Sequence, residues 1–217
     1  MNCFCYERDN KFVLCVEDIQ VEYENILKEA FFQKSGNRFI KEYPNSVEDK
    51  KLVSSNFQRL GEEMFTGKNS DWKAALDMFA RECNKKHIEW YLIGSAADAA
   101  RGVQLNPHDI DIMVNTKDFY RVRDLFKEYI VEPFVDNEGT WVVRYFGRLC
   151  ICGMQVDIAA DHTRDANNYD YEKEKWNDYV LYMEPFESRY QTEIMREREE
   201  RISLLDEFRK KQGNRKI

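Results

Sequence analysis

Apolar residues recur every three or four positions in several stretches of the chain, which is the period of a helix with one buried face. This pattern predicts helices over residues 24–33, 46–65, 70–86, 116–126 and 186–210, and a shorter helix of small residues over 95–101. The last predicted helix is heavily charged, and its inner stripe consists of Ile194, Met195, Ile202, Leu205 and Phe208.

Short apolar or alternating runs between turn residues are typical of strands. They predict strands over 11–16, 90–93, 110–114, 141–146, 149–152, 154–160 and 179–183, with a polar loop over 161–175. The chain therefore runs from a helix-rich beginning through a mixed α/β middle to a helical end. We divide it into an N-terminal accessory segment (1–69), a central core (70–165) and a C-terminal strand and helix packed on that core (166–217).

The composition is that of a globular protein. Its 217 residues suffice for one large domain, or for a compact core with a helical addition. Hydrophobic residues make up 43% and charged residues 34%, which argues against disorder. No apolar run is long enough to predict a membrane-spanning helix, and the first ten residues do not resemble a secretory signal. We therefore expect a cytoplasmic protein with no membrane partner.

The formal net charge of −7 disfavours bulk binding of long nucleic acids, which needs a broad basic surface. It is compatible with a nucleotide, because one triphosphate needs only local positive charge and a metal ion. Two Cys-x-Cys pairs, Cys3/Cys5 and Cys150/Cys152, could in principle supply a zinc site. Their spacing is shorter than usual and the second pair lies in an apolar run, so buried free cysteines are the favoured interpretation.

Two aspartates interrupt an otherwise apolar predicted strand, in the sequence Asp109-Ile-Asp111-Ile-Met-Val. Strand side chains alternate between faces, so Asp109 and Asp111 point the same way with their Cα atoms roughly 6–7 Å apart. Two carboxylates on one face repel each other and lose hydration, and a divalent cation between them would relieve both costs. Mg²⁺ suits such oxygen ligands, because it takes one or two carboxylates together with waters and phosphate oxygens.

Gly94 and Ser95 follow the predicted strand 90–93 and open the small-residue helix. A glycine at this turn allows a phosphate to approach the backbone, and the helix N-terminus offers free N–H groups. Asp157 interrupts another apolar strand, which we expect to lie beside the strand of Asp109 and Asp111. There it could bind the metal and accept the proton of an attacking hydroxyl. A phosphate-binding turn beside a carboxylate metal site favours nucleotidyl transfer.

These residues resemble the DNA polymerase β nucleotidyltransferase superfamily, whose pattern is a hydrophobic residue before Gly-Gly or Gly-Ser, a short helix, Asp-hydrophobic-Asp, and a later Asp on a strand. The match covers roughly residues 75–160. It looks closest to the bacterial branch that includes aminoglycoside and lincosamide nucleotidyltransferases and those of toxin–antitoxin and abortive-infection systems.

The resemblance implies an α/β (α+β) nucleotidyltransferase fold: a small mixed β-sheet flanked by helices, with helical N- and C-terminal additions. It also implies two Mg²⁺ ions and an NTP donor, which we expect to be ATP. By motif position, Gly94 and Ser95 bind the nucleotide phosphates, and Asp109, Asp111 and Asp157 are the catalytic metal ligands.

The predicted activity is Mg²⁺-dependent transfer of a nucleoside monophosphate to a hydroxyl of a small-molecule acceptor, with release of pyrophosphate. A protein or tRNA acceptor, or a nucleotide-binding module without turnover, are the alternatives. In antibiotic-modifying relatives a helical C-terminal part helps to form the acceptor pocket. The helix after Pro185 could do so here, with Arg189 or Arg196 near phosphate.

Simpler interpretations of the same residues stay open. Asp109 and Asp111 could face solvent on an edge strand, Asp157 could be an isolated exposed carboxylate, and Gly94-Ser95 could be an ordinary capped turn. His108 is predicted to be a turn or packing residue. Asp161 and His162 follow the Asp157 strand closely enough to touch a substrate, but loop polarity explains them equally well.

Overall fold

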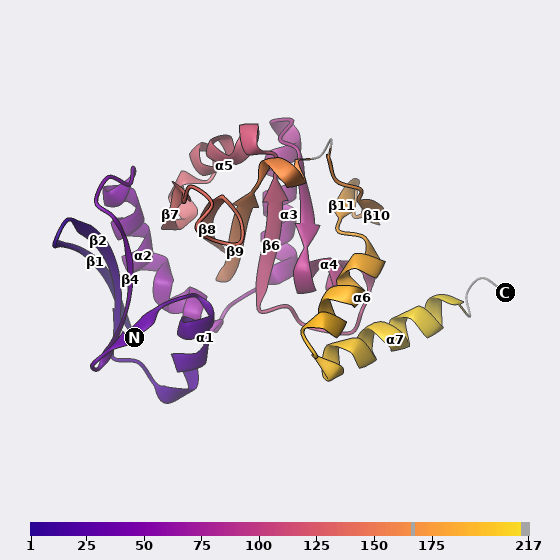
Figure 1. Cartoon of the computed structure of the whole chain (residues 1–217), viewed down its shortest axis with the longest axis horizontal. Helices are drawn as coiled ribbons and strands as arrows, with labels where there is room; N and C mark the ends of the chain where they lie inside the picture. The colour runs from indigo at the N-terminus through magenta and orange to yellow at the C-terminus, as the bar shows by residue number, and fades with distance from the viewer. Residues whose placement is uncertain (166–167, 214–217) are drawn as a thin grey trace.

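The computed structural model describes residues 1–165 and 168–213 and contains two β-sheets (Figure 1). The larger sheet has seven strands in the order β10-β11-β5-β6-β9-β8-β7. Its pairs β6/β9 and β5/β11 are parallel and the others are antiparallel, so the predicted mixed sheet is confirmed. The strands are β5 (Trp90–Ile93), β6 (Asp109–Val114), β7 (Ile130–Asp136), β8 (Tyr145–Ile151), β9 (Met154–Ala160), β10 (Glu172–Trp176) and β11 (Tyr179–Met183).

A second, antiparallel sheet forms most of the N-terminal part, in the order β1-β2-β4-β3. Its strands are β1 (Asn2–Arg8), β2 (Lys11–Glu17), β3 (Gln33–Ser35) and β4 (Arg38–Pro44). The sequence predicted only the strand over 11–16. The hairpin β1–β2 turns at Asp9 and Asn10, both with positive φ, which is the backbone of a tight two-residue hairpin turn. This Asp-Asn pair is the local signal for the missed strand.

The α-helices of the described residues lie around the two sheets, and α2 contacts strands of both. They are α1 (Glu24–Glu29), α2 (Lys50–Thr66), α3 (Trp72–Lys85), α4 (Gly94–Arg101) and α5 (Phe119–Leu125), followed by the C-terminal helices α6 (Phe186–Met195) and α7 (Glu199–Gly213). The side chain of Asp71 caps α3 by accepting from the N–H groups of Lys73 and Ala74, both at 3.0 Å. The prediction placed the start one residue earlier, at Ser70.

The two faces of the larger sheet are covered differently. Ile110 and Ile112 of β6 belong to the main core, which also includes Phe79 of α3 and Phe126, whose rings stack at 5.1 Å. On the other face only a small apolar cluster forms, around Tyr91, Met113 and Ala159. Because Asp109 and Asp111 alternate with Ile110 and Ile112, they lie on this second, less covered face.

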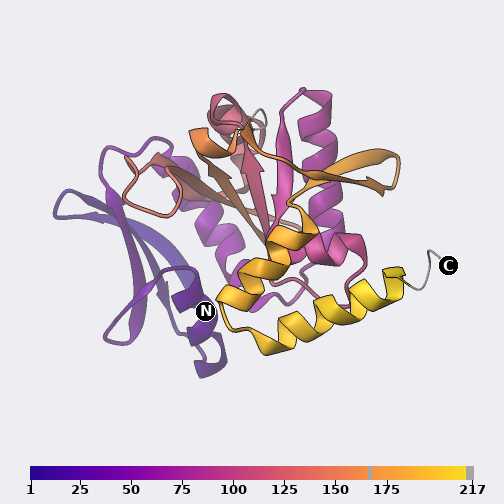
Figure 2. The same ribbon diagram turned by 45° about the vertical axis from the view of Figure 1, so that its right-hand side comes forward.

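The C-terminal region corrects one prediction. The single helix expected over 186–210 is broken into α6 and α7 at residues 196–198, where Glu197 has φ +54°. The expected inner stripe is also wrong at one end, because Ile194 and Met195 are exposed whereas Leu205 is buried. Figure 2 shows α6 crossing in front of the larger sheet and α7 running below it.

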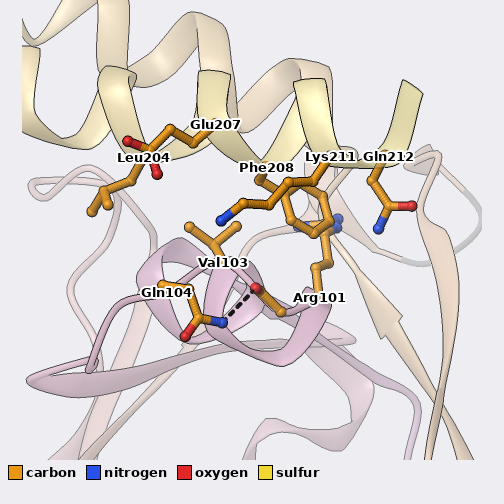
Figure 3. Close-up of a pocket in the computed structure, with 9 residues that line it drawn as sticks. Arg101, Val103, Gln104, Leu204, Glu207, Phe208, Lys211 and Gln212 are labelled. Atoms are coloured by element: carbon orange, nitrogen blue, oxygen red, sulfur yellow. Dashed lines mark hydrogen bonds between the residues drawn. The ribbon is translucent and has the colours of Figure 1, made fainter. Parts of the chain in front are cut away.

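Helix α7 lies over the turn that follows α4, and the two enclose a cavity of about 350 Å³. In Figure 3, Leu204, Phe208 and Lys211 extend from α7 toward Arg101 and Val103. The turn is braced from within, since the amide of Gln104 donates to the carbonyl of Gly102 at 3.1 Å.

Three further differences concern the larger sheet. Strand β7 was not predicted, β8 is one continuous strand where two were expected, and β10 lies partly within the loop expected over 161–175. Residues 166–167 of that loop lie outside the described residues. No helix in the described residues is long and apolar enough to cross a membrane. The three segments proposed from the sequence stay a prediction.

Candidate active site

Three aspartates from two neighbouring strands converge on the less covered face of the larger sheet. Strands β6 and β9 are parallel, and their register places Asp111 directly opposite Asp157. One carboxylate oxygen each of Asp109, Asp111 and Asp157 lies within 4.8 Å of the other two. Within the described residues, no other group of His, Cys, Asp and Glu side chains gathers this closely. The strand pairing therefore brings together the three acids predicted as metal ligands.

Burial makes this cluster unfavourable without a cation. Desolvation, together with repulsion from Asp157, raises the pKa of Asp109 above its ordinary value. Desolvation and the two neighbouring carboxylates raise the pKa of Asp111 much further. Two of the three oxygen donors, Asp109 and Asp111, thus have ionised forms that lack sufficient compensation. A hard divalent cation such as Mg²⁺ supplies it, so the residues present fit the predicted metal.

Gly94 approaches the carboxylates more closely than any larger residue could. It has φ +68°, and a Cβ atom built on it would collide with Oδ2 of Asp111. The residue joins β5 to α4, so the first N–H groups of that helix open beside the acids. Both the backbone conformation and the space require glycine here.

Replacing Gly94 by Ala is expected to reduce nucleotide binding and turnover more than stability. The methyl group would strain the left-handed backbone and push Asp111 aside, which costs roughly 1–3 kcal/mol in all. Calorimetric titration with Mg²⁺ and a non-hydrolysable ATP analogue, beside thermal unfolding, measures both effects. Gly36→Ala is the matched control, because Gly36 has φ +65° with nothing within 4 Å of the added carbon. Equal nucleotide affinity in the two variants would contradict the assignment of Gly94 to the phosphate site.

A cavity of about 650 Å³ opens beside the carboxylates. One wall contains Gly94, Ser95, Asp109 and Asp111, and the opposite wall is the break between α6 and α7. In Figure 1 the lower end of β6 lies between α1 on one side and α6 on the other. The predicted phosphate-binding residues therefore share one open space with Asp109 and Asp111, two of the three predicted metal ligands.

The break between α6 and α7 brings arginines to this cavity. Arg196, Arg198 and Arg201 all line it. Arg198 lies 3.6 Å from Glu193, whereas Arg196 and Arg201 form no ion pair within the described residues. A continuous helix would have spread these side chains around its circumference. The break thus brings a cluster of arginines to the acidic cavity, alongside Glu199 and Glu200.

Arg189 has a different position from Arg196. It lines the cavity, but its guanidinium is buried and donates to Asp98 of α4 at 3.1 Å and to Glu193 at 2.5 Å. It therefore joins α6 to α4. Of the two arginines considered near phosphate from the sequence, Arg196 is the exposed one.

Asp157 is held by a buried arginine that the sequence analysis did not single out. Arg148 of β8 donates from Nε to Oδ1 of Asp157 at 2.6 Å and from NH2 to Oδ2 at 2.8 Å. The same guanidinium donates from NH1 to Glu132 of β7 at 2.5 Å. A two-point contact of this kind fixes the plane of the carboxylate.

The chain of charges continues into the N-terminal sheet. Lys41 of β4 donates to Glu132 at 2.5 Å and to the carbonyl of Ala30 at 3.0 Å, and the hydroxyl of Tyr43 donates to Glu132 at 2.6 Å. Although burial alone would raise the pKa of Glu132, Arg148 and Lys41 lower it below its ordinary value. The four ionic side chains, Lys41, Glu132, Arg148 and Asp157, balance to zero charge. We call them the buried ion network.

The remaining candidates are ordinary turn residues in this structure. Asp161 accepts from the N–H and the hydroxyl of Thr163, at 2.9 and 2.7 Å, and so caps the turn after β9. The imidazole of His162 is mostly exposed and lies 3.9 Å from Asp165. His108 is exposed at the rim of the carboxylate cavity.

Comparison with known proteins agrees with the site geometry. The family model of the aminoglycoside-2''-adenylyltransferases matches residues 76–181, a little under half of the chain, and this range contains Gly94, Ser95 and all three aspartates. The chain belongs to the nucleotidyltransferase superfamily. Within that superfamily, the match points to the aminoglycoside branch.

Other similarities of this nucleotidyltransferase are weaker. A solved structure from Thermotoga maritima, provisionally named a nucleotidyltransferase, shares 20% identity with a TM-score of 0.49. The alignment covers 63% of this chain and 91% of the other. No argument rests on that likeness. No curated protein sequence matches the chain.

Proposed function

We propose that this nucleotidyltransferase moves a nucleoside monophosphate from an NTP, with ATP as the expected donor, to a hydroxyl of a small-molecule acceptor. The observation that carries the proposal is the convergence of Asp109, Asp111 and Asp157 in front of the helix that begins at Gly94. The acceptor oxygen forms a bond to the α-phosphorus of the donor. The bond from that phosphorus to the oxygen bridging the β-phosphate breaks, and pyrophosphate leaves.

Two features support binding of the donor triphosphate in the carboxylate cavity. The N–H groups at the start of α4, with the Ser95 hydroxyl, offer donors to phosphate oxygens. Across the cavity, Arg196 and Arg201 form no ion pair within the described residues, so their guanidinium groups can donate to phosphate; Glu199 and Glu200 line the same cavity. A triphosphate between these walls would have donors on both sides.

Asp109, Asp111 and Asp157 would hold the divalent cation, with two Mg²⁺ ions as the proposed complement. When bound, Mg²⁺ neutralises the phosphate oxygens and lowers the pKa of a coordinated hydroxyl. Asp157 is the proposed acceptor of the hydroxyl proton, at a carboxylate oxygen. Arg148 fixes the direction in which Asp157 points.

Calorimetry followed by measurement of pyrophosphate release tests this function. We expect the wild-type chain to bind a non-hydrolysable ATP analogue only when Mg²⁺ is present, and to release pyrophosphate from ATP when an acceptor is added. The variant Arg196→Ala/Arg201→Ala should bind the analogue about tenfold more weakly or worse, because charge-assisted hydrogen bonds to phosphate are lost. Lys210→Ala is the control, since Lys210 is an exposed cation farther along α7.

Two results would count against the proposal. Analogue binding that does not depend on Mg²⁺ would separate the three aspartates from the donor. Binding without pyrophosphate release, across hydroxyl acceptors of small-molecule, protein and tRNA type, would favour a nucleotide-binding module without turnover.

A further inference from the structure

A second cavity, of about 580 Å³, lies between the N-terminal sheet and the loop that precedes β8. Most of its lining is apolar, and three of these side chains are unusually exposed: Val142 at 95%, Phe31 at 72% and Trp141 at 44%. Ile40, Val143 and Phe146 complete the apolar lining. Such a gathering of exposed apolar groups is uncommon on a monomer, and it gains free energy when a ligand covers it.

Phe31 is also strained. Its φ of +66° is in the left-handed region, where a bulky aromatic residue is a genuine outlier. The strain holds the ring out of the main core and against the cavity, 5.6 Å from the Lys41 ammonium. Strained residues of this kind concentrate at ligand sites, where the surrounding structure compensates their cost.

The apolar cavity adjoins the carboxylate site. Phe146 and Arg148 are two residues apart on β8 and share a face, with the Arg148 guanidinium 5.5 Å from the centre of the Phe146 ring. Arg148 in turn binds Asp157. At the end of α1, Glu29 lines the carboxylate cavity while Phe31 lines the apolar one. The Arg148 side chain therefore lies between Phe146 of the apolar cavity and Asp157, the proposed proton acceptor.

We propose that this apolar cavity binds the acceptor, and that the acceptor is a molecule with a flat apolar body and a hydroxyl group. The inference rests on the function proposed above and specifies its substrate class. The volume falls within the range for drug-sized ligands, roughly 300–1,000 Å³. The aromatic rings of Phe31, Trp141 and Phe146 suit a planar ring system.

Fluorescence titration with 4-methylumbelliferone, a flat hydroxyl-bearing aromatic probe, tests the proposal on the full chain. The main variant is Phe31→Asn, because asparagine tolerates the left-handed backbone and so preserves the fold. The second is Val142→Ser, at a side chain that is almost fully exposed. We expect saturable binding to the wild type, and weakening of about tenfold or more in each variant, with unchanged affinity for Mg²⁺ and the ATP analogue. Val21→Ser is the control, an 83% exposed valine that does not line the cavity.

The outcomes separate this inference from the proposed function. If a hydroxyl acceptor supports pyrophosphate release that Phe31→Asn does not alter, the acceptor site is elsewhere while the function stands. If the probe binds in the cavity as expected but no acceptor yields pyrophosphate, the function fails while the apolar site remains. Absence of probe binding overturns the inference. A wild-type dimer that Phe31→Asn converts to a monomer also overturns it, by making a second copy of the chain the occupant.

Discussion

Replacing Asp111 by Asn is expected to lower nucleotidyl transfer by about three orders of magnitude or more, because a metal ligand contributes several kcal/mol and each 1.36 kcal/mol is a factor of ten. The same change should make the metal-free protein more stable. Burial and the neighbouring carboxylates raise the folded-state pKa of Asp111 well above its ordinary value. The stability contributed by this group is therefore present at acid pH and is lost as the pH rises through the folded-state pKa. Asparagine does not ionise, so the variant avoids that loss.

Thermal unfolding with a chelator, at acidic and at neutral pH, measures the stability effect. The increase in thermal stability of Asp111→Asn over wild type should be larger at neutral pH than at acidic pH. It should disappear when Mg²⁺ stabilises the wild type. Asp9→Asn is the matched control, with the same charge change on the exposed turn of the β1–β2 hairpin. A variant that keeps its activity, or that is less stable than wild type without metal, would contradict the assigned role.

Arg148→Met is expected to destabilise the protein by about 3–5 kcal/mol, because it leaves buried carboxylates without their partner. Arg148 is 1% exposed and holds both Asp157 and Glu132. Denaturant unfolding measures the loss. Adding Glu132→Gln should recover part of it, since removing one charge of each sign restores neutrality in the buried ion network.

The contrasting control is the exposed pair Lys34–Glu24, which has an N–O distance of 2.7 Å, similar to those in the network. Lys34→Met should cost less than about 1 kcal/mol, because solvent screens this pair. Arg148→Lys separates folding from catalysis. Lysine keeps the positive charge but cannot donate to both oxygens of Asp157 in the geometry of the guanidinium. We therefore expect kcat to fall while the affinity for the ATP analogue persists. If Arg148→Lys behaves as wild type in turnover, Arg148 has only a structural part.

The elements that carry the site were predictable because their signals are local. Strands β5, β9 and β11 have the predicted bounds, since each is a short apolar run between turn residues. The site residues are recognisable in the same way. Gly94 is a glycine at a turn, and the charges inside apolar strands are Asp109, Asp111 and Asp157. What the sequence alone does not give is that Asp111 pairs in register with Asp157.

The missed parts have a weak local pattern or depend on contacts that are distant in the chain. Strand β7 contains Pro133 and two register shifts, which obscure its pattern. Strands β1 and β3 each pair with a strand that follows across a short turn, and the Asp9-Asn10 turn is the local signal for β1. The break between α6 and α7 at Glu197 contains no glycine or proline, so the sequence has no local signal for it. Arg148 and Glu132 carried the same signal as the aspartates, a charge within an apolar run. Arg148 and Glu132, which pair in the structure, are 16 residues apart in the sequence, and Lys41 is 91 residues from Glu132. These pairings become evident only in the folded structure.

The position of Lys41 has an evolutionary consequence. The match to the family model begins at residue 76, so the matched segment does not include strand β4, which supplies this cation. The matched segment of this protein therefore depends on a buried cation that lies outside it. A lineage that exchanged its N-terminal sheet would have to change Glu132 or Arg148 at the same time. Among relatives, we expect residues 41, 132, 148 and 157 to vary together as a set of balanced charges.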